Sequence, residues 1–306
     1  MMIEITDLSV EFSGSVKAID NLTLVVPEGK NTIVIGESGS GKSVMLAAML
    51  QILPPSAKIS GSVRLNGLEL LTMSEKQMRS LRGDALSYIP QGSGSSMNPL
   101  LTVGYQVAEP LIEKKGVPKK PALISAVEWM KKLHIGNEER IASAYPHTLS
   151  GGMRQRALIS MGAISGSPIL LADEPTKGLD GERIEMVTDL FLTLKDRTIL
   201  CVSHNLNFAE AIADYVCVMY SSQKVEYCSS KEFFAGPLHP YSRMTLEAMP
   251  ENGLKVNMGF APTHADFDTI GCHFYSRCPH KSERCQSAPP MVEKDGRKVR
   301  CWLYAD

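Results

Sequence analysis

The sequence lacks an excess of positive charge, because 32 lysines and arginines are balanced by 33 aspartates and glutamates. Proteins that bind nucleic acids usually carry a basic surplus, so we expect no nucleic-acid partner. Long hydrophobic runs are also missing. The strongest apolar runs, Leu22–Val26 and Ile169–Ala172, have the length of buried strands and fall far short of the roughly 20 residues that a membrane-spanning helix needs.

A secretion signal is missing too, since Met1–Glu4 is not a basic stretch leading into an apolar one. We therefore expect a cytoplasmic location. In that reducing compartment the seven cysteines are expected to be thiols or metal ligands rather than disulfides. What the chain does have is a hydrophobic content of 43% over 306 residues, enough for the core of one α/β domain with a smaller appendage.

Strand-like and helix-like segments alternate through most of the chain, which predicts an α/β fold around a largely parallel sheet. Residues 92–160 follow a helical pattern and are expected to form a helical subdomain. After about Pro237 the composition shifts to proline, histidine, cysteine and charge, so we expect one main α/β domain at 1–236 and an extension at 237–306. The expected strands are Ile3–Ile5, Leu22–Val26, Thr32–Ile35, Ser62–Leu65, Ile169–Asp173, Thr198–Ser203 and Tyr215–Tyr220.

The segment Gly36–Ser43 matches the pattern GxxxxGK[ST] between a predicted strand and a predicted helix, as a phosphate-binding loop requires. Its glycines let the backbone wrap around phosphates, and the helix N-terminus favours negative charge. Lys42 is expected to reach the β- and γ-phosphates of ATP, and the Ser43 hydroxyl to bind Mg²⁺. The predicted ATP-binding residues of the loop are Gly36, Ser38, Gly39, Ser40, Gly41, Lys42 and Ser43.

The apolar strand predicted at Ile169–Asp173 ends in two acidic residues, Asp173 and Glu174. Carboxylates at the end of a buried strand suit a Mg²⁺ site, so Asp173 is expected to hold the metal directly or through water. Glu174, one residue beyond the strand, is expected to polarise the attacking water as a general base. Together with the phosphate-binding loop, these two acids predict ATP hydrolysis.

The segment Leu149–Arg156 reads LSGGMRQR and resembles the LSGGQ signature of ABC-transporter ATPases. Ser150, Gly151 and Gly152 at a helix start form a second anion site. The resemblance implies that this site binds the nucleotide held by a facing ATPase subunit. It also implies a fold with a parallel sheet core, an N-terminal antiparallel β subdomain and a helical subdomain.

Further residues occur in the order that this family shows. The resemblance implies that Gln91 contacts Mg²⁺ and water, that Asp180 belongs to a loop crossing the dimer interface, and that His204 contacts the γ-phosphate. Phe12, 30 residues before the loop lysine, is expected to stack on adenine, although a core position suits it equally. The sequence departs from the family at Gly92, where peptide-type relatives usually have aspartate, and this leaves the coupling contact open.

The C-terminal segments Pro237–Arg243 and Gly271–Pro279 are similar to those of ATPase subunits in dipeptide, oligopeptide and nickel importers. The resemblance implies a sister ABC ATPase subunit in a heterodimer, two membrane permease subunits and an extracytoplasmic solute-binding protein. It places the chain at the cytoplasmic face of the cell membrane as a peripheral subunit. Peptides, nickel and metal chelates all remain candidate solutes, because selectivity in this family lies in the other subunits.

Four cysteines of the extension follow the spacing Cys–x5–Cys–x6–Cys–x15–Cys, which differs from the paired CxxC of zinc ribbons. A metal staple would help so short a segment to fold. Four thiolates suit a [4Fe-4S] cluster, as the resemblance also suggests. Zinc and metal-free thiols are the alternatives. The four are Cys272, Cys278, Cys285 and Cys301.

Two other functions compete with that of an importer ATPase. A non-transport ABC ATPase of the DNA-repair or translation type would require a coiled-coil insertion or two tandem cassettes, and the sequence has neither. A regulatory subunit that binds ATP without hydrolysing it would be expected to lack the catalytic residues, whereas Glu174 and His204 are both in place.

Overall fold

The computed structural model describes residues 1–13, 16–92, 96–194, 196–249, 259 and 271–305. Residues 93–95 of the predicted helical subdomain, and 250–258 and 260–270 of the predicted extension, lie outside the described residues. The chain folds into two compact units, each described separately below. We call them the phosphate-loop unit (Met2–Val26, Asn31–Thr72 and His204–Asp306) and the signature unit (Met1, Pro27–Lys30 and Met73–Ser203).

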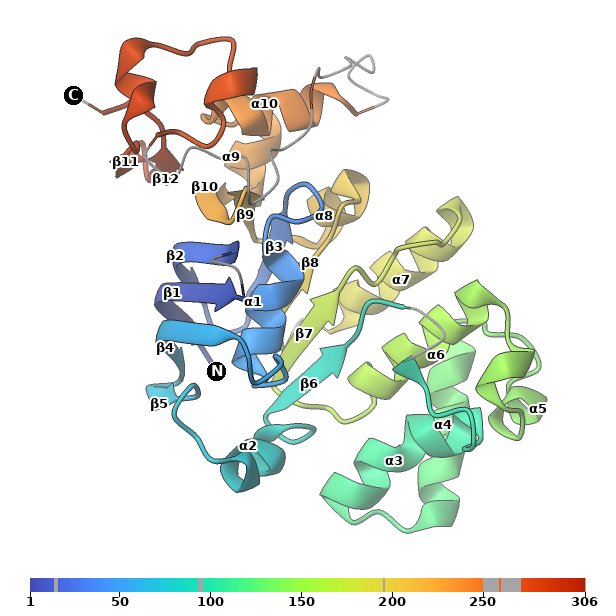
Figure 1. Ribbon diagram of the computed structural model, residues 1–306. Coiled ribbons are helices and arrows are strands. Elements are labelled where there is room, and N and C mark those ends of the chain that lie inside the picture. The colour runs from blue at the N-terminus through green and yellow to red at the C-terminus, as the bar shows by residue number, and fades with distance from the viewer. Residues whose placement is uncertain (14–15, 93–95, 195, 250–258, 260–270, 306) are drawn as a thin grey trace. The chain divides into compact units, whose positions relative to one another are not determined.

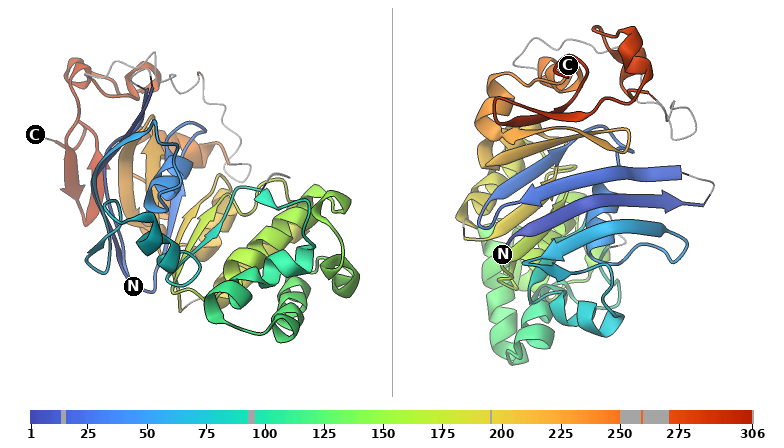
Figure 2. Two further views of the ribbon diagram at one scale, coloured as in Figure 1. Left: turned by 60° about the horizontal axis from the view of Figure 1, so that its bottom comes forward. Right: turned by 90° about the vertical axis from the view of Figure 1, so that its left-hand side faces the viewer.

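The phosphate-loop unit contains an antiparallel sheet in the order β2-β1-β4-β5, visible in Figure 2. Inward-facing positions of β1, such as Ile3 and Ile5, are buried and alternate with more exposed residues, as expected for a sheet with one solvated face. Asn66 and Gly67, at φ 48° and 81°, form the tight turn that their sequence predicts. The strands are β1 (Ile3–Phe12), β2 (Val16–Val26), β4 (Lys58–Leu65) and β5 (Leu68–Glu69).

A second set of strands in this unit runs in the order β11-β12-β10-β9-β3. Strand β3 (Asn31–Ile35) is buried at every position and pairs in parallel with β9 (Tyr215–Tyr220). The remaining pairs are antiparallel. The other strands of the set are β10 (Gln223–Ser229), β11 (Met291–Lys294) and β12 (Arg297–Arg300). The helices of the unit are α1 (Lys42–Met49), α8 (Leu206–Ile212), α9 (Ser230–Ala235) and α10 (Pro240–Glu247).

The C-terminal segment contains two strands that the sequence did not predict, because the residues after Pro237 show little periodicity. Strands β11 and β12 form a hairpin whose turn residues, Asp295 and Gly296, have φ of 52° and 75°. Asp-Gly is a strong hairpin signal, but four-residue strands are too short to show clear alternation. Because β12 pairs with β10, the described part of this segment belongs to the phosphate-loop unit, and the boundary at 237 stays a prediction.

The signature unit has parallel strands in the order β8-β7-β6 and a group of helices, α3 to α6, that pack on one another (Figure 1). Every residue of β7 and β8 is buried, as is usual for central parallel strands. The elements are α2 (Glu75–Leu81), β6 (Leu86–Ile89), α3 (Val103–Lys115), α4 (Lys119–Lys132), α5 (Glu138–Ala142), α6 (Gly151–Ala163), β7 (Ile169–Asp173), α7 (Gly181–Thr193) and β8 (Thr198–Val202).

These features confirm the predicted α/β class with parallel strands, an N-terminal antiparallel sheet and a helical part. Short 3₁₀ helices complete the described structure at Pro146–Thr148, Tyr275–Arg277 and Glu283–Gln286. Every helix in the described part of the chain is too short or too polar to pass through a membrane.

Candidate functional site

The phosphate-binding loop connects β3 to α1 within the phosphate-loop unit. Gly41 is the N-cap of α1, and glycine has no side chain with which to cap the first amide groups of this helix. Those N–H groups and the helix dipole are therefore suited to a phosphate. Ser38, Gly39 and Ser43 are exposed to solvent, whereas Ser40 is buried.

Two loop positions require glycine for steric reasons. Gly36 has φ of +151°, and a Cβ there would lie 2.0 Å from the carbonyl oxygen of Met219. Gly41 has φ of +97°, and a Cβ there would lie 2.2 Å from the carbonyl oxygen of Ala18. Backbone atoms cannot yield as a flexible side chain can, so only glycine allows the loop to pack this closely against β9 and β2.

Lys42 lies inside the loop, with only 4% of its surface exposed. Its Nζ donates hydrogen bonds to the carbonyl oxygens of Gly36 and Glu37, at 2.8 Å each. A third hydrogen bond reaches Ser40 Oγ at 3.2 Å. The loop is thus closed around its own ammonium group, and an incoming phosphate would replace these oxygens as the partner of Lys42.

Asp173 ends β7 in the signature unit and is 2% exposed. Tyr88, on the neighbouring parallel strand β6, forms a hydrogen bond with its carboxylate. Burial, together with the nearby Asp173 charge, raises the pKa of Tyr88, so its hydroxyl keeps its proton and donates a hydrogen bond to the carboxylate. Tyr88 therefore orients Asp173, a contact that the sequence motif does not reveal.

Glu174 follows directly and adopts a left-handed backbone conformation with φ of +48°. This conformation is rare for residues with a side chain and is found disproportionately at functional sites. The Glu174 N–H donates to the carbonyl oxygen of Val202 at 2.9 Å, which attaches the turn to β8. The Glu174 residue is 8% exposed, and Lys177 Nζ lies 3.6 Å from Oε2.

Gln91 is partly buried and lies just beyond the end of β6. At the next position, Gly92, a larger residue would clash with a neighbouring side chain. A Cβ at position 92 would lie 1.3 Å from Oε1 of Gln155, a buried residue of α6. Gln155 Nε2 donates to the carbonyl oxygen of Pro175 at 3.1 Å. The side-chain amide of Gln155 therefore packs against Gly92 with its oxygen and is hydrogen-bonded to Pro175 with its nitrogen. It occupies the space that an aspartate side chain at position 92 would need.

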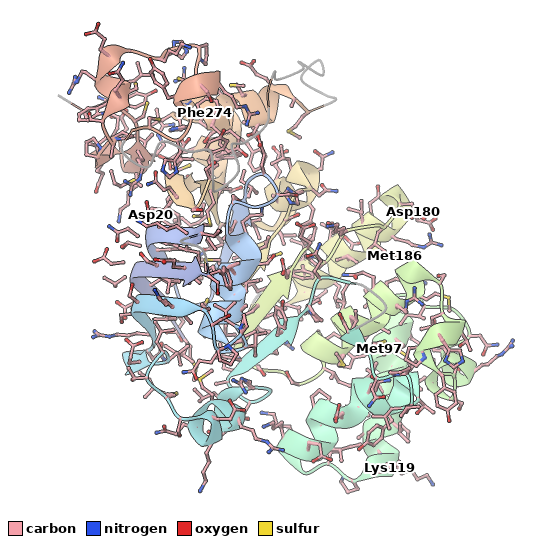
Figure 3. All side chains as sticks on the ribbon, viewed as in Figure 1. Asp20, Met97, Lys119, Asp180, Met186 and Phe274 are labelled. Carbon is pink, nitrogen blue, oxygen red and sulfur yellow. The ribbon has the colours of Figure 1, made fainter. Side chains whose placement is uncertain are left out.

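The signature residues lie at the start of α6. Ser150 is the N-cap, and its Oγ accepts a hydrogen bond from the Met153 N–H at 3.3 Å. A Cβ on Gly151 would meet only open space among the described atoms, whereas one on Gly152 would lie 3.6 Å from Leu179. A pocket of about 410 Å³ adjoins this helix start and is lined by His134, Ile135, Ser150, Met153, Arg156, Glu182, Arg183 and Met186. Met186 of this lining is labelled in Figure 3.

Three further predicted residues stand at the ends of elements. Asp180 is the N-cap of α7 and accepts a hydrogen bond from the Arg183 N–H at 3.1 Å (Figure 3). His204 is exposed and precedes Asn205, the N-cap of α8. Phe12 ends β1 and is partly buried. The contacts predicted for these residues are with a nucleotide or a second subunit, so their roles stay predictions.

The four late cysteines line one small cavity of about 80 Å³ in the phosphate-loop unit, beside His239. Burial raises the pKa of Cys272 to about 11, and the neighbouring thiols contribute to this shift. Among the described residues, no group of three or more potential ligands is arranged to hold a single metal ion. The other cysteines, at positions 201, 217 and 228, are buried in the core as small apolar side chains.

Comparisons with known proteins agree with the motifs. Residues 19–177 match the family model described as ABC transporter, and residues 225–285 match that of the oligopeptide/dipeptide transporter C-terminal region. The chain is 34% identical to the oligopeptide transport ATP-binding protein OppD of Salmonella typhimurium, covering 99% of this chain and 93% of OppD. It is 33% identical to the dipeptide transport ATP-binding protein DppD of Bacillus subtilis, covering 99% and 94%.

A solved structure supports the fold. The dimeric ATP-binding cassette MJ0796, described in a post-hydrolysis state bound to ADP and Pi, aligns with a TM-score of 0.68 at 25% identity. The alignment covers 74% of this chain and 98% of that cassette.

Proposed function

This chain belongs to the ABC transporter family, among the oligopeptide and dipeptide transport ATP-binding proteins, and from that membership we propose that it powers peptide uptake. As an ABC ATPase it binds ATP and hydrolyses it to ADP and phosphate. The observation that supports a role in transport is the match of residues 225–285 to the C-terminal region of oligopeptide/dipeptide transporters. A DNA-repair or translation ATPase would not be expected to have this region.

We assign the chemical roles as follows. Lys42 exchanges the carbonyl oxygens of its own loop for the β- and γ-phosphates of ATP. Mg²⁺ would be held by Ser43, Gln91 and Asp173, and it would neutralise part of the charge of the phosphates. The buried Glu174 polarises the attacking water, and His204 contacts the γ-phosphate.

A second ATPase subunit completes the site in this proposal. The start of α6 at Ser150, Gly151 and Gly152 lies next to a pocket, and no described atom lies close to the position of a Cβ on Gly151. A helix start that is open in this way suits the γ-phosphate of a nucleotide held by a facing chain. The partner is a sister ABC ATPase, so that the working unit is a heterodimer. The cassette MJ0796 is described as dimeric, which supports the pairing of two cassettes but not the identity of the second one.

The helical part of the signature unit is the proposed docking site for two membrane permease subunits. Its surface exposes Leu100, Ile124 and Tyr145 at 82%, 59% and 42%, which leaves them available for contact with a membrane subunit. A pocket of about 780 Å³ adjoins two of them and is lined by Leu100, Leu101, Thr102, Tyr105, Glu109, Lys119, Leu123, Val127, Ala142, Ser143 and Tyr145. Docking here places the chain at the cytoplasmic face of the membrane.

The experiment that tests this function is solute-stimulated hydrolysis. The chain is assembled in lipid vesicles with its sister ATPase and permeases, and phosphate release is measured with the extracytoplasmic binding protein and a mixture of di- to pentapeptides. We expect peptides to raise the ATPase rate severalfold, because the loaded binding protein favours the closed ATPase dimer. Stimulation by nickel or a metal chelate, with none by peptides, would overturn the peptide assignment.

We further propose that the four late cysteines hold a [4Fe-4S] cluster. Their thiols line the same cavity, and the pKa of Cys272 responds to all three of its partners, which supports convergence. Four cysteine thiolates are the usual ligands of such a cluster. The cluster would serve as a structural staple for a segment with a small apolar core of its own.

Anaerobically purified protein should therefore be brown, with broad absorbance near ~400 nm and about four irons per chain. Replacing Cys278 by serine should remove the colour and lower the unfolding temperature of the C-terminal segment. The matched control, Cys217→Ser, changes a buried cysteine of β9 outside the cavity and should retain the iron. Colourless protein without iron or sulfide would exclude the cluster, and one zinc per chain would favour the alternative metal.

A further inference from the structure

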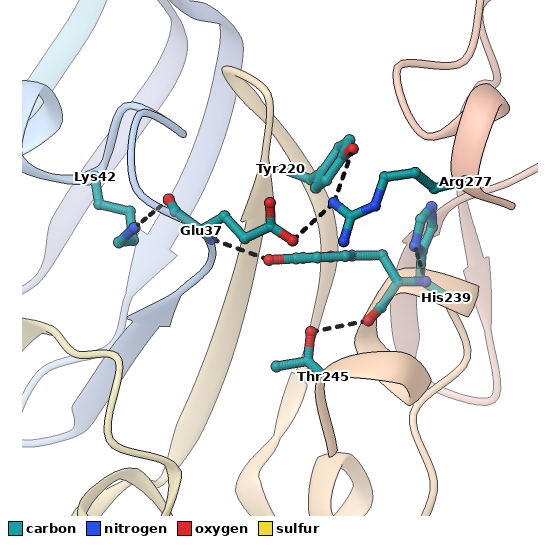
Figure 4. Close-up of polar contacts among 7 residues, drawn as sticks. Glu37, Lys42, Tyr220, His239, Thr245 and Arg277 are labelled. Carbon is teal, nitrogen blue, oxygen red and sulfur yellow. Dashed lines mark hydrogen bonds and ion pairs between the residues drawn. The ribbon is translucent and has the colours of Figure 1, made fainter. Parts of the chain in front are cut away.

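Glu37, the first variable residue of the phosphate-binding loop, forms polar contacts through its N–H, its carbonyl oxygen and its carboxylate (Figure 4). Its carbonyl oxygen accepts the hydrogen bond from Lys42 Nζ at 2.8 Å. Its N–H donates to the Tyr241 hydroxyl at 3.0 Å, and its carboxylate pairs with Arg277 Nη1 at 2.8 Å. The same residue thus joins the lysine that should bind phosphate to side chains more than 200 positions away in the sequence.

Arg277 is built into this arrangement rather than placed on the surface. Its side chain is 8% exposed, against 34% for Glu37. The guanidinium also donates to the Tyr220 hydroxyl at 3.3 Å and lies 5.7 Å from the ring centres of Tyr220 and Phe274. A half-buried charge pair with a second hydrogen bond and aromatic contacts restricts the arginine to one geometry.

Tyr241 is equally well fixed. It is 3% exposed, and its ring centre lies 4.6 Å from that of Tyr220. Its N–H donates to His239 Nδ1 at 3.1 Å and its carbonyl oxygen accepts from Thr245 Oγ1 at 2.9 Å. The hydroxyl that receives the Glu37 N–H is therefore attached to a rigid helix start in α10.

We propose that Arg277 is a positioning residue for ATP binding: with Tyr241, it holds Glu37 so that the phosphate-binding loop is ordered before ATP arrives. The inference rests on the proposed ATPase site and adds a residue from the C-terminal segment to it. A loop that is already ordered loses less conformational entropy when phosphate binds.

The test measures ATP affinity of the full-length chain, by titration with a fluorescent ATP analogue and Mg²⁺, together with kcat and KM for hydrolysis. Arg277→Gln should weaken affinity about fivefold to tenfold, the size expected for one charge-assisted hydrogen bond, and should raise KM while kcat stays nearly constant. Arg277→Lys, which keeps the charge, should restore most of the affinity. Lys281→Gln makes the same charge change at an exposed position of the same segment and should match the unmodified chain.

A double-mutant cycle separates this role from a general loss of stability. If Arg277 acts through Glu37, Glu37→Gln should weaken affinity on its own, and adding Arg277→Gln to it should change little more. Equal affinity of Arg277→Gln and the unmodified chain, or fully additive effects in the cycle, would overturn the proposal. Should Arg277→Gln fail to fold, unchanged or tighter ATP binding by Glu37→Gln would overturn it as well. An unmodified chain that does not bind ATP would instead refute the proposed function.

Discussion

Glu174→Gln is expected to lower the rate of ATP hydrolysis at least about 100-fold while ATP affinity changes less than about twofold, because only the group that polarises water is lost. Glutamine has the shape of glutamate, so the left-handed turn and its hydrogen bond to β8 should persist. The ion pair with Lys177 contributes little, since that lysine is 54% exposed. The measurement is phosphate release at saturating ATP in the chain combined with its proposed ATPase partner, with ATP binding titrated in parallel.

The control for this variant is Glu185→Gln, which makes the same change at an exposed position of α7. It should hydrolyse ATP at the unmodified rate. Hydrolysis by Glu174→Gln at that same rate would show that another residue is the general base. A large loss of ATP affinity would show that Glu174 has a role in the ground state.

The second large effect concerns Lys42. Lys42→Met should weaken ATP binding by more than about 30-fold, because about 2–3 kcal/mol of charge-assisted hydrogen bonding to phosphate is lost. Methionine keeps most of the volume of a side chain that is only 4% exposed, so the loop should not collapse. Affinity is measured by titration with ATP and Mg²⁺, and folding by thermal unfolding.

Lys58→Met is the matched control, since Lys58 in β4 is 84% exposed in its side chain. It should bind ATP as the unmodified chain does. Unchanged affinity in Lys42→Met, in a protein that unfolds at the normal temperature, would remove the lysine from the binding site. Lost affinity with a much lower unfolding temperature would instead identify its bonds to Gly36 and Glu37 as structural.

Much of the fold is predictable because the relevant signals are local. Strand β7, a run of apolar residues closed by an aspartate, has the bounds that the sequence predicts, and so does β9. Helix α1, which starts at Lys42, agrees with the helix predicted to follow the phosphate-binding loop, because in this motif a helix follows the glycine-rich turn. Strands β1 and β2 are longer than predicted, because pairing with each other stabilises polar residues that a run of apolar residues does not include.

The sequence by itself determined the motifs that carry the chemistry. A phosphate-binding loop, two acids at a strand end and a serine-glycine helix start are each specified within a few consecutive residues. Backbone conformation and hydrogen bonding at that range depend on local residue types, which is why the motifs are visible without a structure.

Only the tertiary structure decided which distant residues support those motifs. Arg277 meets Glu37 across 240 positions of sequence, Gln155 occupies the space beside Gly92, and Tyr88 orients Asp173. Strand pairing and side-chain packing bring such residues together, and neither depends on separation along the chain. Arginine, glutamine and tyrosine are common residue types without a spacing rule of their own, so their roles arise from burial and from the partner that the fold places within hydrogen-bonding distance.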